Sequence, residues 1–197
     1  MTVHCHDENC FRGHPVRLSD YMSQLIVITA IGRDRAGVVH ELTRAVLDCG
    51  GNIVESRMTA LGAEFAMLLL VSGNWATLTR LESDLDKVAE SGNLTVTIRR
   101  TESRPQLAGM LPYAVDVVCL DQPGIVHNIA GFFSDRKIDI AELSTRSYAA
   151  AHTGSPMFSV QLSINIPGDV PIAGLREEFM DFCDQLNLDA IMEPVKG

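Results

Sequence analysis

The chain has little of what a nucleic-acid-binding protein or a membrane protein needs. Its 197 residues carry 16 lysines and arginines against 25 aspartates and glutamates, a formal charge of −9. A protein that binds a phosphate backbone normally shows the opposite balance, and the chain has no basic stripe and no zinc-finger spacing. The apolar run from Ala66 to Val71 is far shorter than the roughly 18 residues of a membrane span. We therefore expect neither direct DNA binding nor membrane insertion.

Cysteines are few, and their number is odd. The five are Cys5, Cys10, Cys49, Cys119 and Cys183. Such a scattered set in a chain of this length does not predict a disulfide framework, and it favours a reducing compartment. Residues 1–20 contain charges and histidines where a signal peptide needs an apolar stretch. The expected location is cytoplasmic.

The first twenty residues contain side chains that bind metals in other proteins. They are His4, Cys5, His6, Cys10 and His14. A structural zinc site usually has tighter pairs and a folded frame around them, and this tract has neither. We interpret residues 1–20 as a flexible leader and predict no metal site.

Motifs of enzymes are also missing. The chain has no G-x-S-x-G, no G-x-x-x-x-G-K-[ST], no H-E-x-x-H and no G-x-G-x-x-G after a strand. Cys119 and His127 are near each other in sequence, but the residue that matches Cys119 in the repeat described next is Gly32. We predict no catalytic residues and no cofactor.

An internal repeat is the main feature of the sequence. Residues 34–40, DRAGVVH, align with residues 121–127, DQPGIVH, at an offset of 87. The same ungapped offset pairs Asp48 with Asp135, Ile53 with Ile140 and Glu55 with Glu142. A register kept over this length indicates duplication of one unit.

The repeat predicts two domains. Residues 102–112 contain two prolines and a glycine without periodicity, which is typical of a linker. The predicted domains are therefore residues 21–101 and residues 113–197, after the leader of residues 1–20.

Each copy has the same pattern of predicted elements. In the first copy, a β-branched apolar run over residues 25–31 predicts a strand buried on both sides. A helix with Val39 and Leu42 inward follows, then two strands, a helix capped by Asn74 with Trp75 in its apolar stripe, and a last strand. The second copy repeats this order, with Val126 inward on its first helix. The order βαββαβ predicts an α+β fold of two tandem ferredoxin-like sandwiches.

The two sheets differ on the face away from the helices. Residues 65–71 are apolar on both sides of a strand, whereas residues 158–165 alternate strictly between apolar and polar. We expect this face of the first sheet to be covered by the other copy or by another chain, and that of the second sheet to stay partly exposed to solvent. An oligomer is one way to provide that cover.

The repeated Asp-x-x-Gly before a helix is the best candidate binding site. A helix start has unpaired N–H groups and a partial positive charge, so the backbone near Gly37 and Gly124 can receive a small anion such as an amino-acid carboxylate. The alternative is that Asp34 and Asp121 only tie the turn to their own backbone. The candidate ligand-binding residues at these turns are Asp34, Arg35, Gly37, Val38 and His40, and Asp121, Gln122, Gly124, Ile125 and His127.

Two further matched pairs are candidates. His40 and His127 lie in the first helical turn, where each ring can contact a ligand or only pack at the surface. Asn52 and Asp139 precede the second strand of each copy, and we expect them beside the Asp-x-x-Gly turn, where they would hold an ammonium or amide group. Their alternative role is turn formation.

The unit as a whole resembles the ACT domain, a module that usually binds amino acids at domain interfaces. The stretches that carry the resemblance are residues 27–32 (VITAIG), 62–65 (GAEF), 72–75 (SGNW) and 140–143 (IAEL), within residues 24 to 193. ACT turns often read Asp-x-Pro-Gly, which holds at Pro123 but not at Ala36.

The resemblance is to tandem-ACT transcriptional repressors that control the glycine cleavage enzymes. It implies a sensor of glycine or a similar amino acid that acts by contacting a DNA-binding activator protein. The acidic charge independently favours action through such a partner. The alternative is a stand-alone amino-acid-binding module that regulates a metabolic enzyme, and a third, weaker reading is an enzyme that uses His40 or His127.

Overall fold

The computed structural model describes residues 24–103 and 109–195. The chain divides between residues 105 and 106 into two compact units, which we call unit 1 and unit 2. Unit 1 contains β1 (Gln24–Arg33), α1 (Val38–Asp48), β2 (Asn52–Leu61), β3 (Glu64–Gly73), α2 (Trp75–Gly92) and β4 (Leu94–Thr101). Unit 2 contains β5 (Met110–Leu120), α3 (Ile125–Asp135), β6 (Asp139–Ala149), β7 (Pro156–Pro167), α4 (Ile172–Gln185) and β8 (Asp189–Pro194).

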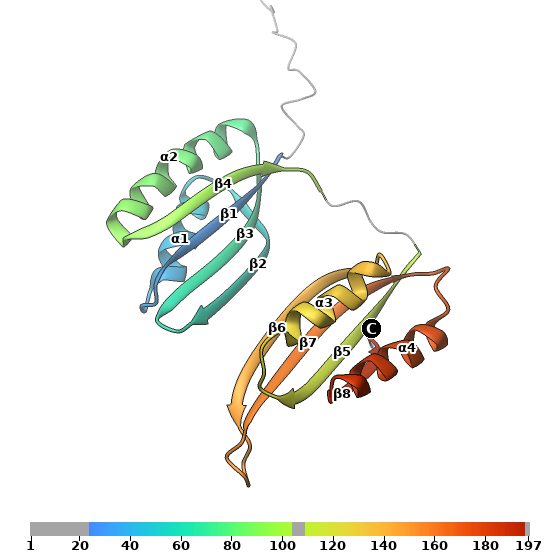
Figure 1. The fold of residues 1–197 in the computed structure, drawn as a ribbon. Coiled ribbons are helices and arrows are strands. Elements are labelled where there is room, and N and C mark those ends of the chain that lie inside the picture. Colours follow the sequence, from blue (N-terminus) through green and yellow to red (C-terminus); the bar gives the residue numbers. More distant parts are fainter. Residues whose placement is uncertain (1–23, 104–108, 196–197) are drawn as a thin grey trace, which may run out of the picture. The chain divides into compact units, whose positions relative to one another are not determined.

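Each unit has one antiparallel sheet of four strands. The strand order is β2-β3-β1-β4 in unit 1 and β6-β7-β5-β8 in unit 2. The first strand of each unit therefore lies in the middle of its sheet, between two strands that are distant in sequence. The two helices of each unit cover one face of its sheet (Figure 1). This is the ferredoxin-like α+β sandwich, so the predicted fold class is confirmed.

A β-bulge recurs at the same position in both sheets. The register of β2 shifts between Ile53 and Glu55, and that of β6 shifts between Ile140 and Glu142. These residues match at the offset of 87 found in the sequence. Because bulges are retained as structural features rather than defects, the shared bulge supports duplication of one ancestral unit.

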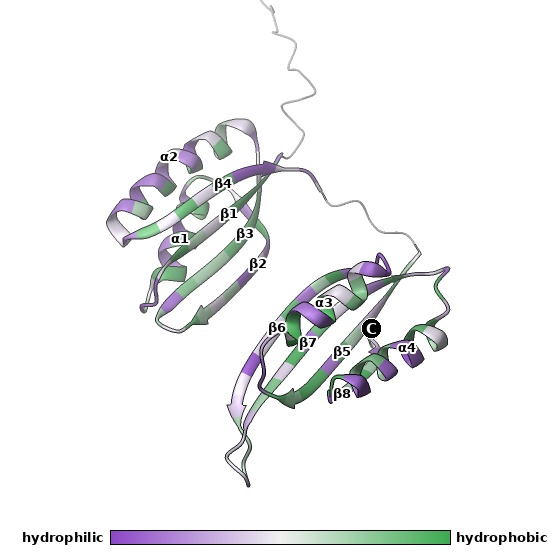
Figure 2. Cartoon of the chain, in the orientation of Figure 1, coloured by the Kyte–Doolittle hydropathy of each residue, from purple (hydrophilic) through white to green (hydrophobic). Residues whose placement is uncertain are grey.

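The core of unit 1 lies between the sheet and its helices. Alternate residues of β1 are buried, namely Ile26, Ile28 and Ala30. The helices add one stripe each, made of Val38, Leu42, Ala45 and Val46 in α1 and of Leu78, Leu81 and Leu85 in α2. Hydrophobic residues run along β1 and β3 in Figure 2.

The predicted inward stripe of the first helix is confirmed in each unit except at its first position. Val39 and Val126 were expected to face inward, but both are half-buried, and the preceding residues, Val38 and Ile125, are in the core. Each helix starts directly after a left-handed glycine. That glycine turns the first helical side chain toward the sheet.

The predicted cap of α2 is present, but one residue of its predicted stripe is misplaced. The Asn74 side chain accepts a hydrogen bond from the Thr77 backbone N–H at 2.8 Å, which stabilises the helix start. Trp75, by contrast, is 62% exposed, while Leu78 is fully buried. Trp75 is the first residue of α2, and the buried residues of this helix begin one turn later at Leu78.

Four phenylalanines dominate the core of unit 2. Phe132 and Phe133 of α3 contact Phe179 and Phe182 of α4, with ring centroids 5.0–6.4 Å apart. Tilted and edge-to-face contacts of this kind add stability beyond that of simple burial. Three of the rings are buried, and Phe182 is half-buried at the surface between the two helices.

The face of each sheet away from the helices differs between the units. In unit 1 it exposes Ile31 and Leu68, so the prediction that residues 25–31 are buried on both sides is wrong for this unit by itself. In unit 2 it carries both kinds of side chain: Gln161 donates a hydrogen bond to Asp116 at 2.9 Å, and the neighbouring Ile191 is 59% exposed. That another surface covers the apolar face of unit 1 stays a prediction.

One predicted boundary differs from the structure. Strand β5 begins at Met110, inside the predicted linker of residues 102–112. Pro112 lies where the pairing of β5 with β8 ends: the ladder reaches Tyr113, and the Pro112 carbonyl accepts a hydrogen bond from the Val195 N–H at 3.1 Å, so a proline at this end position leaves the rest of the ladder intact. The predicted leader of residues 1–20 lies outside the described residues.

The described cysteines are buried and unpaired with one another. Cys49, Cys119 and Cys183 are free thiols. Burial raises the pKa of all three, to about 11 for Cys183, so the thiols stay protonated at neutral pH. None of the helices within residues 24–103 and 109–195 is long and apolar enough to cross a membrane.

The contrast between Leu78 and Trp75 gives a test of the α2 packing. Leu78→Ala leaves a cavity in the core and is expected to lower the free energy of unfolding by about 2–5 kcal/mol. Trp75→Ala in the same helix removes an exposed ring and is expected to change it by less than about 0.5 kcal/mol. Urea unfolding followed by circular dichroism measures both, and equal losses would contradict this packing.

Candidate functional site

The two Asp-x-x-Gly turns have the same backbone conformation. Gly37 has φ 93° and ψ −12°, and Gly124 has φ 92° and ψ −5°, both in the left-handed region. Each glycine is the residue immediately before its helix. A side chain other than glycine is strained at this φ, so the turn depends on glycine in both copies.

The start of each of these helices lacks a side-chain cap. No side chain accepts a hydrogen bond from the first turn of α1 or of α3, whereas Asn74 does so for α2. The N–H groups that point out of a helix start are therefore left to water or to a ligand. Together with the helix dipole they favour a small anion at both turns.

Both turns are fastened to the neighbouring strand connection. The Asp34 backbone N–H donates to the Ala63 carbonyl at 3.0 Å, and the Asp121 N–H donates to the Pro156 carbonyl at 2.9 Å. These carbonyls lie just before β3 and at the first residue of β7, respectively. The turn is thus held by the sheet, which fixes the direction of the helix start.

The side chains of the two aspartates have different surroundings. Asp121 accepts a hydrogen bond from the Ser147 hydroxyl at 3.0 Å, so it ties the turn to β6 rather than to its own backbone. The residue that matches Ser147 in the first copy is Ala60. Among the described residues, no side chain binds the Asp34 carboxylate, which is exposed. Asp34 therefore remains open to a ligand in a way that Asp121 does not.

A charged pair borders the first turn only. The Arg35 guanidinium donates two hydrogen bonds to the Glu41 carboxylate, at 2.7 and 2.6 Å. This bond lowers the pKa of Glu41 and raises that of Arg35. The matching residues in unit 2 are Gln122 and Asn128, which are neutral. A ligand carboxylate at the first turn would compete with Glu41 for Arg35.

A shallow groove of about 460 Å³ lies at the first turn. It brings together five predicted residues, which are Asp34, Arg35, Gly37, Val38 and His40. It is also lined by Val39, Thr43 and Met58, which the sequence reasoning did not select. Nothing in the sequence marked Met58, because its place opposite α1 depends on the pairing of β2 with β3.

The predicted residues of each turn present different groups to solvent. Asp34, Arg35 and His40 are exposed, as are their counterparts Asp121, Gln122 and His127. Val38 and Ile125 are only 2% and 3% exposed. Their side chains belong to the core, and the Val38 N–H donates to the Arg35 carbonyl at 3.5 Å.

Asn52 and Asp139 are not beside the turn of their own unit. Asn52 pairs with Ser72 at the end of the sheet where β1 begins. Arg33, which leads into the turn, lies eight residues further along β1, about 27 Å from that end. Asp139 lies at the matching place and accepts a hydrogen bond from Asn165 at 3.4 Å. The expectation of adjacency is wrong because the first helix returns the chain to the opposite end of the sheet. A ligand role for either residue stays a prediction.

No group of three potential metal ligands occurs in residues 24–103 and 109–195. The histidines and cysteines of residues 1–20 lie outside the described part of the chain.

Comparison with known proteins agrees with the geometry. A family model described as ACT domain matches residues 24–99, which is nearly all of unit 1. The chain is 33% identical over 162 residues to the glycine cleavage system transcriptional repressor of Escherichia coli, covering 82% of this chain and 85% of that protein. The chain belongs to the ACT domain family. It is a tandem ACT protein of the regulatory kind.

Solved structures extend the likeness to both ACT units. A crystal structure provisionally named as a glycine cleavage system transcriptional repressor aligns with a TM-score of 0.69 and 29% identity, covering 89% of this chain and 99% of that one. A protein of unknown function from Galdieria sulphuraria aligns with a TM-score of 0.73 and 25% identity, covering 89% and 100%. The tandem ACT architecture is therefore shared over most of the chain.

The left-handed glycines provide a direct test of the ACT turns. Gly37→Ala places a Cβ at φ 93° and is expected to cost about 1–2 kcal/mol of unfolding free energy. Gly174→Ala is the control, because a Cβ at this helical glycine meets no atom within 4 Å and alanine is expected to stabilise by up to about 1 kcal/mol. Chemical unfolding measures both variants, and a stable Gly37→Ala protein would show that the turn tolerates a side chain.

Proposed function

We propose that this tandem ACT protein is an amino-acid-responsive transcriptional repressor of the glycine cleavage system that acts through a DNA-binding partner protein. The observation that carries the proposal is the uncapped helix start after a left-handed glycine, with the open Asp34 carboxylate beside it. The name of the relative from Escherichia coli, which is similar over 82% of this chain, supports the choice of pathway.

The ligand chemistry follows from the groups at the first turn. The backbone N–H groups of the first turn of α1 donate hydrogen bonds to the carboxylate of an amino acid. The Asp34 carboxylate accepts its ammonium group through a charge-assisted hydrogen bond. Both groups bind atoms that all amino acids share, and a ligand as small as glycine needs no further pocket. Unit 1 is the better site, because the Ser147 hydroxyl already occupies Asp121 in unit 2.

The charge of the chain supports action through a partner. A protein with a net charge of −9 is repelled by the phosphate backbone, so repression needs a second protein that contacts DNA. The protein would exist in two forms that differ in affinity for the partner. An amino acid that binds one form more tightly shifts the population toward it, and this coupling typically changes the free energy of partner binding by about 1–3 kcal/mol.

Calorimetry with glycine, alanine and serine tests the ligand site. We expect one of these amino acids to bind the full chain, and Asp34→Asn to weaken that binding at least about tenfold, because a charge-assisted hydrogen bond is lost. Asp121→Asn is the matched control and is expected to have a smaller effect. No binding of any of the three would contradict sensing, and a larger effect of Asp121→Asn would assign the ligand to unit 2.

A DNA mobility-shift assay tests the mode of action. The purified protein alone is expected to leave DNA from upstream of the glycine cleavage genes unshifted at physiological salt, because its charge opposes phosphate contact. Added to the DNA-bound activator of these genes, it is expected to change the migration of the complex. A shift by the protein alone would contradict action through a partner, and co-purification with a metabolic enzyme instead of a DNA-binding protein would favour the enzyme-regulating alternative.

A further inference from the structure

Unit 2 has a groove between its two helices. It has a volume of about 500 Å³ and is lined by ten residues of α3, its C-cap and α4. The residues that matter below are Gly131, Phe132 and Asp135 on α3, and Glu178, Asp181 and Phe182 on α4. We call it the α3–α4 groove.

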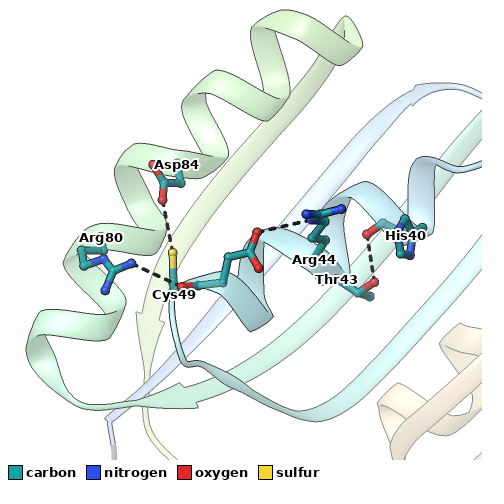
Figure 3. A network of polar contacts seen from close by, with 7 residues as sticks. His40, Thr43, Arg44, Cys49, Arg80 and Asp84 are labelled. Carbon is teal, nitrogen blue, oxygen red and sulfur yellow. Dashed lines mark hydrogen bonds and ion pairs between the residues drawn. The ribbon is translucent and has the colours of Figure 1, made fainter.

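The corresponding contact in unit 1 is bridged by side chains. The Cys49 thiol donates to Asp84 at 3.4 Å, and the Arg80 guanidinium donates to the Asp48 carbonyl at 3.3 Å, so both bonds join the end of α1 to α2 (Figure 3). The residue of unit 2 that matches Cys49 is Arg136. In unit 2 the end of the first helix is therefore joined to the second helix by a longer side chain, since Arg136 is bonded to Glu178 of α4.

The floor of the α3–α4 groove is aromatic. Phe132 and Phe182 lie with ring centroids 5.0 Å apart, and Phe182 is only half-buried. Gly131 has no side chain, and a Cβ built on it meets no atom within 4 Å. Phe132 is only 5% exposed and lies under Arg136, so the apolar surface that the groove offers is that of Phe182, beside the open space over Gly131.

The groove already holds one arginine of the chain itself. The Arg136 guanidinium lies 3.7 Å from the centroid of the Phe132 ring and donates to the Glu178 carboxylate at 3.0 and 2.9 Å. A planar cation is therefore stacked on a ring and paired with a carboxylate at the same time. Phe182 and Asp181 provide a second ring and a second carboxylate in the same groove, with no arginine of this unit paired to Asp181.

Acidic residues form the rim of the groove. Asp135 comes from α3, and Glu178 and Asp181 come from α4. All three side chains are exposed. This negative rim disfavours a nucleic acid or another acidic protein and favours a basic one.

We propose that the α3–α4 groove docks an arginine-bearing amphipathic helix of a partner protein. The apolar side of that helix lies on Phe182 and in the open space over Gly131, and its arginines pair with Asp181 and Asp135. A shallow groove between two helices with an apolar floor is the usual receptor for one face of a third helix. The docking surface rests on the proposed function only for the identity of the partner, which would be the DNA-binding protein.

A pair of peptides tests the proposal on the full-length chain. The first is an 18-residue designed helix with a leucine stripe flanked by arginines, and the second has glutamate in place of every arginine. Fluorescence anisotropy of the labelled peptides is expected to give a dissociation constant at least about tenfold lower for the arginine peptide, with a difference that shrinks at high salt. Equal affinities, or no binding of the arginine peptide, would overturn the proposal.

Two glycine variants locate the binding. A Cβ at Gly131 meets no atom within 4 Å, so Gly131→Trp extends a large side chain from this open position and is expected to weaken binding of the arginine peptide at least about tenfold. Gly174→Trp is the matched control, because Gly174 is also a helical glycine with open space around it but does not line the groove. Equal affinity of the two variants for the peptide would overturn the assignment to this groove. Circular dichroism of both variants checks that the fold is retained.

The outcome is separate from that of the proposed function. Glycine binding measured on the Gly131→Trp protein reports the ligand site alone, since Gly131 is not at the turns. Peptide binding without amino-acid binding would leave the groove assignment standing while sensing fails. Amino-acid binding without peptide binding would leave sensing standing while the groove assignment fails.

Discussion

A left-handed glycine at the junction of the first strand and the first helix is the constraint on which both units depend. At φ near +92°, Gly37 and Gly124 directly precede the helix and leave its first turn without a side-chain cap. The backbone bonds from Asp34 and Asp121 to the neighbouring strand connection hold this turn against the sheet. A helix start that is fixed in direction but chemically unsatisfied is suited to receive an anion.

The two copies have kept this turn and diverged around it. In unit 1 the Asp34 carboxylate is open and an Arg35–Glu41 pair borders the groove, whereas in unit 2 Ser147 binds Asp121 and the matching pair is neutral. At the other end of the first helix, a cysteine in unit 1 corresponds to an arginine in unit 2. Duplication followed by such changes allows one unit to bind a ligand and the other to present a protein surface.

The charge distribution is consistent with that division of roles. In unit 2, three acidic residues, Asp135, Glu178 and Asp181, line the groove that contains the Phe182 ring. Acidic side chains there repel phosphate and attract basic protein segments. A regulator that reaches DNA through another protein needs a surface of this kind, and the binding of a small anion at a separate helix start does not compete with it.

The sequence by itself determined the duplication, the βαββαβ order, the cap at Asn74 and the glycine turns, because each depends on local pattern and on residues with special backbone behaviour. Only the tertiary structure decided which residues meet. The return of α1 to the far end of the sheet separates Asn52 from Asp34, and strand pairing brings Met58 to the first turn. The groove over Phe182 depends on how two helices that are far apart in sequence pack against one sheet. No local sequence pattern determines the spacing between those helices.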